Sequence, residues 1–260
     1  MYNEYKTRAE FMEACGYEIN GQWYPRVTKI VEIKAKPALY KFYGEATSYA
    51  AAKAMTEESA KEGTLIHETV EGYLLGKNPL IPESIKPAFD SFVEFLNRTS
   101  IQVLPEYVEK RVHSPEHRYA GTTDALALID GRFGVLDIKT SQAIYRDYSL
   151  QTSAYMDPLS KELPSLETRW ILRIDQIKTC KLCDSTLRPK GGRNKIRRNW
   201  QPGNYRPACP EDQHRWDDLK GVIEIKEFPH WQEDFQAFLG AKKLWEWENE
   251  YWLRQVGYLR

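Results

Sequence analysis

The strongest constraint on folding lies in one short segment near the middle of the chain. Asp130-Gly131 separates two apolar, β-branched runs at residues 121–129 and 133–138. A two-residue connection of this composition is typical of a type I′ turn, which needs positive φ at both central positions. We therefore predict a β-hairpin in which the numbers of facing residues sum to 261.

This register brings ionisable side chains together at the open end of the hairpin. Asp124 faces Asp137, and Lys139 projects from the same face as Asp137 because it lies two residues along the strand. Buried like charges are costly unless compensated, and a divalent cation held by oxygen ligands compensates them. The alternative is a buried Asp–Lys–Asp salt-bridge cluster with a structural role. A bulge near Gly134 would shift the register.

Two further pairs of polar residues occur at helical spacing. His67 and Glu71 lie at i and i+4, so they share one helix face and suit a metal site. Gln151 and Tyr155 have the same spacing, and an amide with a phenol can hydrogen-bond phosphate or a base edge, while the ring can stack. The alternatives are a packed or exposed helix residue for His67, and an ordinary packing face with a polar edge for the second pair.

Hydrophobic periodicity and breakers predict the remaining elements. We expect an α/β fold with a mixed sheet, in the order helix, helix, three strands, helix, strand, insertion, strand, helix. The predicted helices span about residues 38–76, 83–98, 143–155 and 231–254, and the predicted strands 103–112, 121–129, 133–138, 170–174 and 221–228.

Four patterns follow one another along the chain: G-x-x-x-H-x-x-x-E at 63–71, G-x-x-D at 121–124, D-x-K at 137–139 and Q-x-x-x-Y at 151–155. This order resembles the PD-(D/E)XK nuclease superfamily, specifically its RecB-like exonuclease branch. The segment 24–39 also looks like the N-terminal segment of phage-encoded and mitochondrial genome-maintenance members. The resemblance covers roughly residues 24–175. Three residues depart from the family pattern. The acid of D-x-K is Asp137 rather than the commoner Glu, and Thr123 stands where the Pro of the family name would be. Arg26 stands where a small hydroxyl residue often precedes Val-Thr.

The resemblance implies a restriction-endonuclease-like core, a mixed β-sheet flanked by helices, as a single nuclease domain over residues 1–260. It implies metal-dependent hydrolysis of DNA, with exonuclease action favoured and Mg²⁺ or Mn²⁺ as cofactor. Carried over by position, the metal ligands would be His67, Asp124, Asp137 and the Ile138 carbonyl. Lys139 would orient or activate the attacking water, Glu71 would support the ligands, and Gln151 and Tyr155 would position the DNA strand.

Two other function classes remain open on the sequence. A non-catalytic DNA-binding protein could use the same fold, and a two-carboxylate hydrolase could use Asp124 and Asp137 as acid and base. EDTA would not stop the latter. A complete G-x-x-x-x-G-K-[ST] motif is missing from the sequence, so we expect no ATP motor on this chain.

Residues 178–215 break the α/β pattern and read as an inserted, cysteine-containing subdomain or loop. Cys180-x-x-Cys183 is followed by Cys209 and His214, which together could hold a structural zinc ion. The alternatives, ranked second and third, are cysteines without a metal and an iron–sulfur cluster that also uses Cys15.

The same insertion is strongly basic. Residues 178–198 hold eight Lys or Arg and one Asp. We expect a flexible flap that contacts phosphate, with a merely solvated loop as the alternative, and Trp200 follows it as an aromatic neighbour. The predicted DNA-binding residues of the flap are Arg188, Lys190, Arg193, Lys195, Arg197 and Arg198.

Composition restricts the partners and the compartment. Thirty-seven Lys and Arg balance thirty-seven Asp and Glu, so the chain is not a general polycation. The start of the sequence has acids and no apolar core, so we expect no secretory signal. Four cysteines do not make a disulfide framework. We expect a cytoplasmic protein, in the bacterial host cytoplasm if phage-encoded. DNA single strands or duplex ends are the expected partners, with recombination or replication proteins as further candidates and no membrane.

Overall fold

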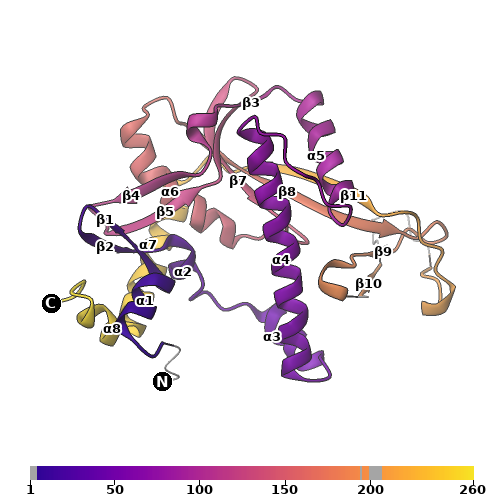
Figure 1. The fold of residues 1–260 in the computed structure, drawn as a ribbon, viewed down its shortest axis with the longest axis horizontal. Helices are drawn as coiled ribbons and strands as arrows, with labels where there is room; N and C mark the ends of the chain where they lie inside the picture. Colours follow the sequence, from indigo (N-terminus) through magenta and orange to yellow (C-terminus); the bar gives the residue numbers. More distant parts are fainter. Residues whose placement is uncertain (1–4, 194, 199–206) are drawn as a thin grey trace.

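The apolar runs in the middle of the chain assemble into a seven-stranded mixed sheet (Figure 1). The computed structural model describes residues 5–193, 195–198 and 207–260. The sheet has the order β10-β9-β8-β7-β6-β3, and β11 also pairs with β8. Its strands are β3 (Ile101–Val103), β6 (Ala125–Ile129), β7 (Arg132–Lys139), β8 (Thr168–Thr179), β9 (Thr186–Leu187), β10 (Ile196–Arg197) and β11 (Lys220–Glu227). Strands β7 and β8 run parallel, and the other neighbours are antiparallel.

Helices cover both faces of this sheet, which confirms the expected α/β layout. The helices are α1 (Arg8–Cys15), α2 (Val27–Val31), α3 (Pro37–Glu45), α4 (Tyr49–Leu74), α5 (Lys86–Arg98), α6 (Asp147–Glu162), α7 (Gln232–Glu248) and α8 (Glu250–Gln255). Short 3₁₀ turns occupy Pro105–Tyr107, Lys190–Gly192 and Glu211–Gln213. Two smaller hairpins are formed by β1 (Gly16–Ile19) with β2 (Gln22–Pro25), and by β4 (Lys110–Ser114) with β5 (Tyr119–Thr123).

Alternation along the central strands divides the core into two layers. On one face, Leu126 and Val135 pack with α6, α7 and the N-terminal segment. On the other face, Leu136 and Ile138 pack with Ile66 of α4 and with α5. Because successive strand residues point to opposite faces, strands buried on both sides read as continuous apolar runs.

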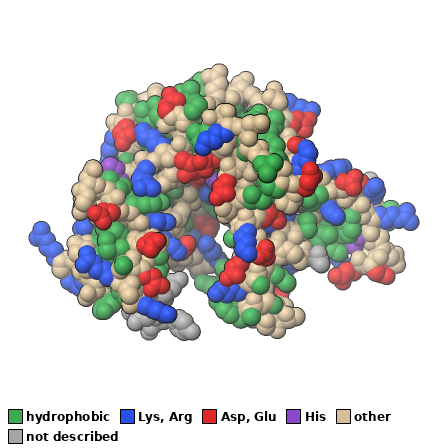
Figure 2. Space-filling view, in the orientation of Figure 1, with side chains coloured by type: hydrophobic (Ala, Val, Ile, Leu, Met, Phe, Trp, Pro, Cys, Tyr) green, Lys and Arg blue, Asp and Glu red, His purple; other side chains and the backbone are tan. Residues whose placement is uncertain are grey.

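Helix α4 does more than cover the sheet. Its C-terminal half contributes Ile66 and Val70 to the core, whereas its N-terminal half projects beyond the sheet beside α3 (Figure 1). Figure 2 shows the surface hollowed between this projecting arm and the lobe that carries both chain ends. The arm therefore lies next to open surface on a face that mixes acidic and basic side chains.

Several predicted boundaries were wrong for identifiable reasons. The helix expected over 38–76 is two helices, because Ser48 caps a new one by accepting from the Ala51 N–H. The helix expected to stop at Asp157 continues through Pro158 to Glu162. The strand expected over 103–112 is interrupted by a 3₁₀ turn, and the one over 121–129 is broken at Asp124.

Candidate functional site

The hairpin turn has the predicted geometry. Asp130 has φ of 49° and Gly131 has φ of 81°, as a type I′ turn requires. The register runs from Ile129 opposite Arg132 to Ala125 opposite Leu136, so the facing residue numbers sum to 261 as expected. No bulge interrupts these five pairs.

The ladder ends one residue before the expected Asp124–Asp137 pair. Asp124 lies between β5 and β6, and its Oδ2 accepts the Ile138 N–H at 2.6 Å. Its own carbonyl accepts the N–H of Glu109 at 3.0 Å. Directly opposed carboxylates in a sheet are destabilising, and the break turns the Asp124 carboxylate onto a backbone donor instead. The hairpin still delivers both acids to the same end of the sheet.

Helix α4 brings an imidazole to this end. His67 Nε2 lies 2.7 Å from the Ile138 carbonyl oxygen and 3.7 Å from Asp124 Oδ2. The neighbouring Ile66 and Val70 are buried in the core, which fixes the helix face that carries His67. The helix face that carries His67 thus meets the strand that carries D-x-K.

Asp137 is completely buried and tied to two neighbours. Lys139 Nζ lies 2.6 Å from Asp137 Oδ2, and Gln151 Nε2 donates to Oδ1 at 3.0 Å. Burial raises the pKa of Asp137 to about 6; Lys139 lowers it, and the charge of Asp124 raises it. Burial opposes the charge on Lys139, but Asp137 and Asp124 outweigh burial and raise the pKa of Lys139. The ammonium is therefore held charged beside the carboxylates.

Gln151 and Tyr155 share a face of α6 and contact each other. Gln151 Nε2 also donates to Tyr155 Oη at 3.0 Å. Tyr155 is only 1% exposed, so neither face of its ring is open for stacking on a base. The ring of Tyr155 is packed in the core, and a role of Tyr155 in positioning a DNA strand stays a prediction. Its hydroxyl instead supports Gln151, which orients Asp137.

Two glycines of the sequence patterns make room for other pattern residues. A Cβ on Gly121 would lie 2.5 Å from Tyr155 Cε1. A Cβ on Gly63 would lie 2.7 Å from Thr140 Oγ1 and 3.2 Å from Lys190 Nζ. Real Cβ atoms essentially never lie within 3.0 Å of another heavy atom, so an added Cβ would force the buried Tyr155 ring to shift at Gly121 and the Thr140 hydroxyl to shift at Gly63. The patterns are thus spatially interlocked.

Acidic residues extend the site on its solvent side. The pKa of Glu109 is raised, by burial first and then by the negative charges of Asp124 and Glu71, while His67 opposes the shift. Glu109 lies in the turn between the 3₁₀ helix Pro105–Tyr107 and β4, where it adopts φ of 52°. The sequence carried no signal for Glu109, because its proximity to Asp124 depends on the break between β5 and β6.

The basic insertion is held against the protein more firmly than a flexible flap would be. Arg188 Nε donates to Asp175 Oδ1 at 2.8 Å and to Oδ2 at 2.6 Å, and its Nη2 donates to the Thr140 carbonyl at 2.7 Å. Lys190 is 4% exposed and donates to the same carbonyl at 2.7 Å. Burial first, and then the charge of Arg188, lower the pKa of Lys190 to about 8. Both side chains are occupied within the chain, directly after the D-x-K strand.

The remaining basic residues of the insertion lie at or near the surface. Lys195 pairs with Glu45 at 3.4 Å, and the guanidinium carbon of Arg193 lies 4.1 Å from the centre of the Phe42 ring. Arg197 is half-buried and Arg198 is exposed. A role of these residues in DNA binding stays a prediction, and Trp200 lies outside the described residues.

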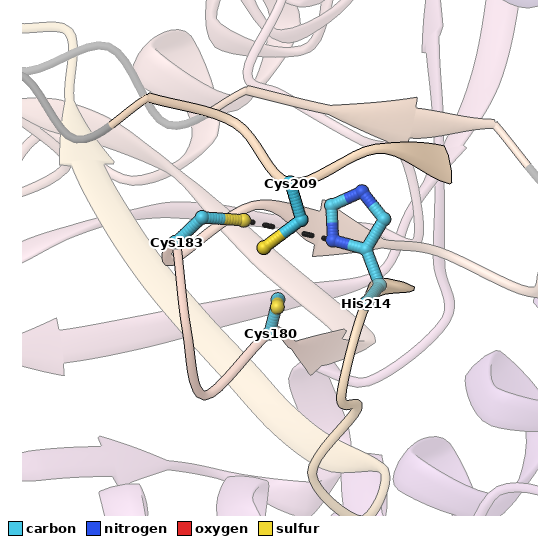
Figure 3. A group of neighbouring side chains, drawn as sticks. All are labelled: Cys180, Cys183, Cys209 and His214. Carbon is cyan, nitrogen blue, oxygen red and sulfur yellow. Dashed lines mark hydrogen bonds between the residues drawn. The ribbon is translucent and has the colours of Figure 1, made fainter. Parts of the chain in front are cut away.

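Three cysteines and a histidine of the insertion meet, as Figure 3 shows. One ligand atom from each of Cys180, Cys183, Cys209 and His214 lies within 4.8 Å of the others, and the group can hold a metal ion. Cys15 lies elsewhere, in the core beside the N-terminal helix, with its Sγ 3.1 Å from Tyr5 Oη. Cys15 is therefore not part of this group, and the identity of the metal stays a prediction.

The donor atoms at the hairpin end suit a hard divalent cation. Asp137 Oδ2 is buried, and its one charged partner among the described residues is the Lys139 ammonium at 2.6 Å. Carboxylate and carbonyl oxygens with one imidazole are the set that Mg²⁺ or Mn²⁺ accepts. Among the residues that the structure describes, only the cysteine–histidine group has all its ligand atoms within 4.8 Å of one another. At the hairpin end, Lys139 already contacts the Asp137 carboxylate and the Ile138 N–H already donates to the Asp124 carboxylate. A cation bound there would compete with both for these oxygens.

Comparisons with known proteins do not assign a function to these side chains. No family model matches the chain, and no curated protein matches it. The chain is similar to a solved structure described as the crystal structure of SSO0001, with 14% identity over 89% of this chain and 83% of that one, and a TM-score of 0.32. It is also similar to LHK-Exo in complex with dAMP, with 12% identity over 91% and 95% of the two chains and a TM-score of 0.33. Likenesses this distant carry no functional weight, so function has to be inferred from the site.

The described helices include none with the length and apolar character needed to span a bilayer.

Proposed function

We propose that this chain is a metal-dependent nuclease of the PD-(D/E)XK type that hydrolyses phosphodiester bonds in DNA, with exonuclease action favoured. One observation supports this most directly. Two carboxylates, an ammonium, an imidazole and a backbone carbonyl converge at one end of an otherwise apolar hairpin; they come from α4, from β7 and from Asp124 just before β6. A purely structural salt bridge would need neither His67 against the Ile138 carbonyl nor the acids on the solvent side.

The roles follow from the contacts of each group. His67, Asp124, Asp137 and the Ile138 carbonyl would hold Mg²⁺ or Mn²⁺. A bound divalent cation supplies a lowered pKa for its water and polarises a phosphoryl oxygen. Lys139, held charged by the two carboxylates, would face the negative charge that develops on the phosphate. Gln151 fixes the orientation of Asp137 through its hydrogen bond.

A line of aromatic and basic side chains leads away from Lys139 toward the surface. Lys139 Nζ lies 5.3 Å from the ring centre of Tyr148, whose ring lies 5.8 Å from that of Tyr145. Tyr145 is 42% exposed and lies within electrostatic reach of Arg193, which in turn covers Phe42. We name these five residues the aromatic–basic track.

The track favours a single strand as substrate at the catalytic end. Aromatic rings stack bases regardless of sequence, and cations contact the phosphates between them. Further exposed rings, Tyr40 at 63% and Tyr49 at 69%, lie on the same projecting arm of α3 and α4. If a duplex end opens and one strand binds along this arm, that strand would reach Lys139.

The test is digestion of 5′-labelled, 3′-labelled and circular DNA with Mg²⁺ or Mn²⁺. Asp124→Ala, Asp137→Ala and Lys139→Ala should each lose at least about a hundredfold in rate. The matched control is Asp90→Ala, which removes a surface acid that pairs only with Lys86 along α5 and should keep full activity. Circular dichroism confirms that each variant is folded.

Full activity in all three site variants would refute the proposal. Binding of DNA without cleavage under any metal condition would favour the non-catalytic DNA-binding alternative. Hydrolysis that EDTA leaves unchanged would favour the two-carboxylate hydrolase. Resistance of the circular substrate, with loss of one end label first, would establish exonuclease action and its polarity.

A further inference from the structure

The ligand atoms of the cysteine–histidine group lie close to the spacing of a tetrahedral zinc site. With Zn–S near 2.3 Å and Zn–N near 2.0 Å, tetrahedral geometry places sulfur and nitrogen ligands about 3.5 Å apart and two sulfurs about 3.8 Å apart. Cys183 Sγ lies 3.5 Å from His214 Nδ1, and all four ligand atoms lie within 4.8 Å of one another. The four side chains point toward one centre in Figure 3.

The surroundings of the group resemble those of a built metal site. The Leu182 N–H lies 3.5 Å from Cys180 Sγ, and Cys183 Sγ lies 3.2 Å from Ser185 Oγ. The Cys183 thiol donates to the Ser185 hydroxyl here, and once that sulfur is a metal-bound thiolate the hydroxyl can donate to it instead; donors of this kind support thiolate ligands. The His214 ring stacks on Trp216 with centres 4.7 Å apart, which fixes its orientation. Cys180 and Cys183 are buried, whereas Cys209 and His214 are half-buried.

The thiols differ in how readily they ionise. Burial raises the pKa of Cys180, but backbone N–H groups of Leu182, Cys183 and Arg215 outweigh it and lower the value to about 7. Burial and the neighbouring thiols raise the pKa of Cys209 to about 11.

Apolar side-chain packing within the described part of the insertion is sparse. In the described parts of residues 178–215, the buried residues are Cys180, Cys183, Ser185 and Lys190, with no aliphatic or aromatic side chain among them. A segment without an apolar core needs another source of stability, and a structural metal is the usual one in small, loop-rich units. Backbone hydrogen bonds do join its described parts, such as the Lys181 N–H to the Arg215 carbonyl at 2.8 Å, but they bury no apolar surface.

The group also encloses the basic segment in the sequence. Residues 188–198 lie between Cys183 and Cys209, so a metal would anchor the chain on both sides of them. In this segment Lys190 and Arg188 donate to the Thr140 carbonyl, one residue after Lys139. Gly191 packs so closely on α4 that a Cβ would lie 2.9 Å from the Ser59 backbone nitrogen. A metal that fixes the ends of this segment would therefore also hold Arg188 and Lys190 against the Thr140 carbonyl, at the end of the D-x-K strand.

We propose that Cys180, Cys183, Cys209 and His214 bind one structural Zn²⁺ ion that clamps the insertion and seats its basic segment against α4 and Thr140. This site is separate from the hairpin end and takes a soft-ligand metal rather than Mg²⁺ or Mn²⁺. The proposal does not depend on nuclease activity, because metal content and protease resistance test it directly.

The first experiment measures metal in the full chain, purified under reducing conditions and freed of loosely bound ions. We expect about one zinc ion per chain and no iron, and Co²⁺ substitution should give the visible bands of a tetrahedral thiolate site. Cys180→Ser with Cys209→Ser should abolish zinc binding. Cys15→Ala is the matched control, since it removes a thiol outside the group and should keep the metal. Ser185→Ala should weaken zinc binding by about 10–100-fold by removing only the supporting hydroxyl.

The second experiment uses the unmodified protein, so it does not depend on the folding of a variant. Removing zinc with a strong chelator should speed tryptic cleavage within residues 178–215 while the central sheet stays resistant, and restoring Zn²⁺ should reverse the change. Metal-free protein with unchanged protease resistance would overturn the proposal. So would a disulfide within the group in freshly reduced and repurified protein, zinc content unaffected by the double substitution, or iron with absorption near 400 nm, roughly the region of thiolate-bound iron.

Discussion

Gly121→Ala tests whether the sequence patterns are interlocked as the structure shows. The new Cβ would lie 2.5 Å from Tyr155 Cε1, and the Tyr155 ring is fully buried, so the ring or the strand must shift. Overpacking of this kind costs about 1–3 kcal/mol in the free energy of unfolding. For a chain of this size, each kcal/mol corresponds to about 2–4 °C in Tm, so we expect a decrease of about 2–12 °C. Because Tyr155 Oη accepts from Gln151, the shift should also weaken Mn²⁺ binding at Asp137.

The control and the coupling experiment separate this effect from a general effect of alanine. Gly240 lies in α7, and a Cβ added there would meet nothing within 4 Å, so Gly240→Ala should stabilise the helix by up to about 1 kcal/mol. Urea unfolding followed by tryptophan fluorescence measures both variants. In a Tyr155→Leu background the cost of Gly121→Ala should largely vanish, giving a coupling energy of about 0.5–3 kcal/mol. Equal stability of Gly121→Ala and wild type, or an equal cost in both backgrounds, would refute the reasoning.

Two further predictions concern the same end of the sheet. Gly63→Ala should destabilise the protein by about 1–3 kcal/mol relative to Gly72→Ala in the same helix. The reason is that a Cβ on Gly63 would meet Thr140 and Lys190 closer than ordinary contact distance, whereas a Cβ on Gly72 would not. Thermal unfolding measures the difference, and equal Tm values would contradict it. Asp137 has a pKa raised to about 6, so protons compete with metal for its carboxylate below that pH. Mn²⁺ affinity measured by calorimetry should be level above about pH 7 and fall about tenfold per unit well below pH 6. The same affinity at about pH 5 and pH 7 would argue against Asp137 as a ligand.

The elements that sequence predicted well are those governed by local chemistry. Asp130-Gly131 determines its own turn, since few residue pairs adopt positive φ twice, and the turn then determines the register of five pairs. The helix predicted at 83–98 appears as Lys86–Arg98 because its apolar residues recur at helical spacing. The end of α3 before Ser48 could have been recognised from the capping residue, whereas the continuation of α6 through Pro158 could not.

The contacts within the site could not be predicted from local sequence. The approach of His67 to the Ile138 carbonyl joins positions 71 residues apart, and it depends on the packing of Ile66 and Val70 under the sheet. The break at Asp124, which replaces the expected Asp124–Asp137 pair, arises because β5 leaves the central sheet to pair with β4. The burial of Tyr155 and Lys190 likewise depends on neighbours distant in the chain.

The sequence by itself determined the hairpin, its register, the residue types of the site and their order, because turn chemistry and hydrophobic periodicity act over a few residues. Only the tertiary structure decided which of those residues meet. It placed Cys209 and His214 beside the Cys180–Cys183 turn, put Cys15 in a different core, and turned basic residues of the insertion inward. These outcomes depend on contacts between distant segments, which form only when both layers of the core have packed against the sheet.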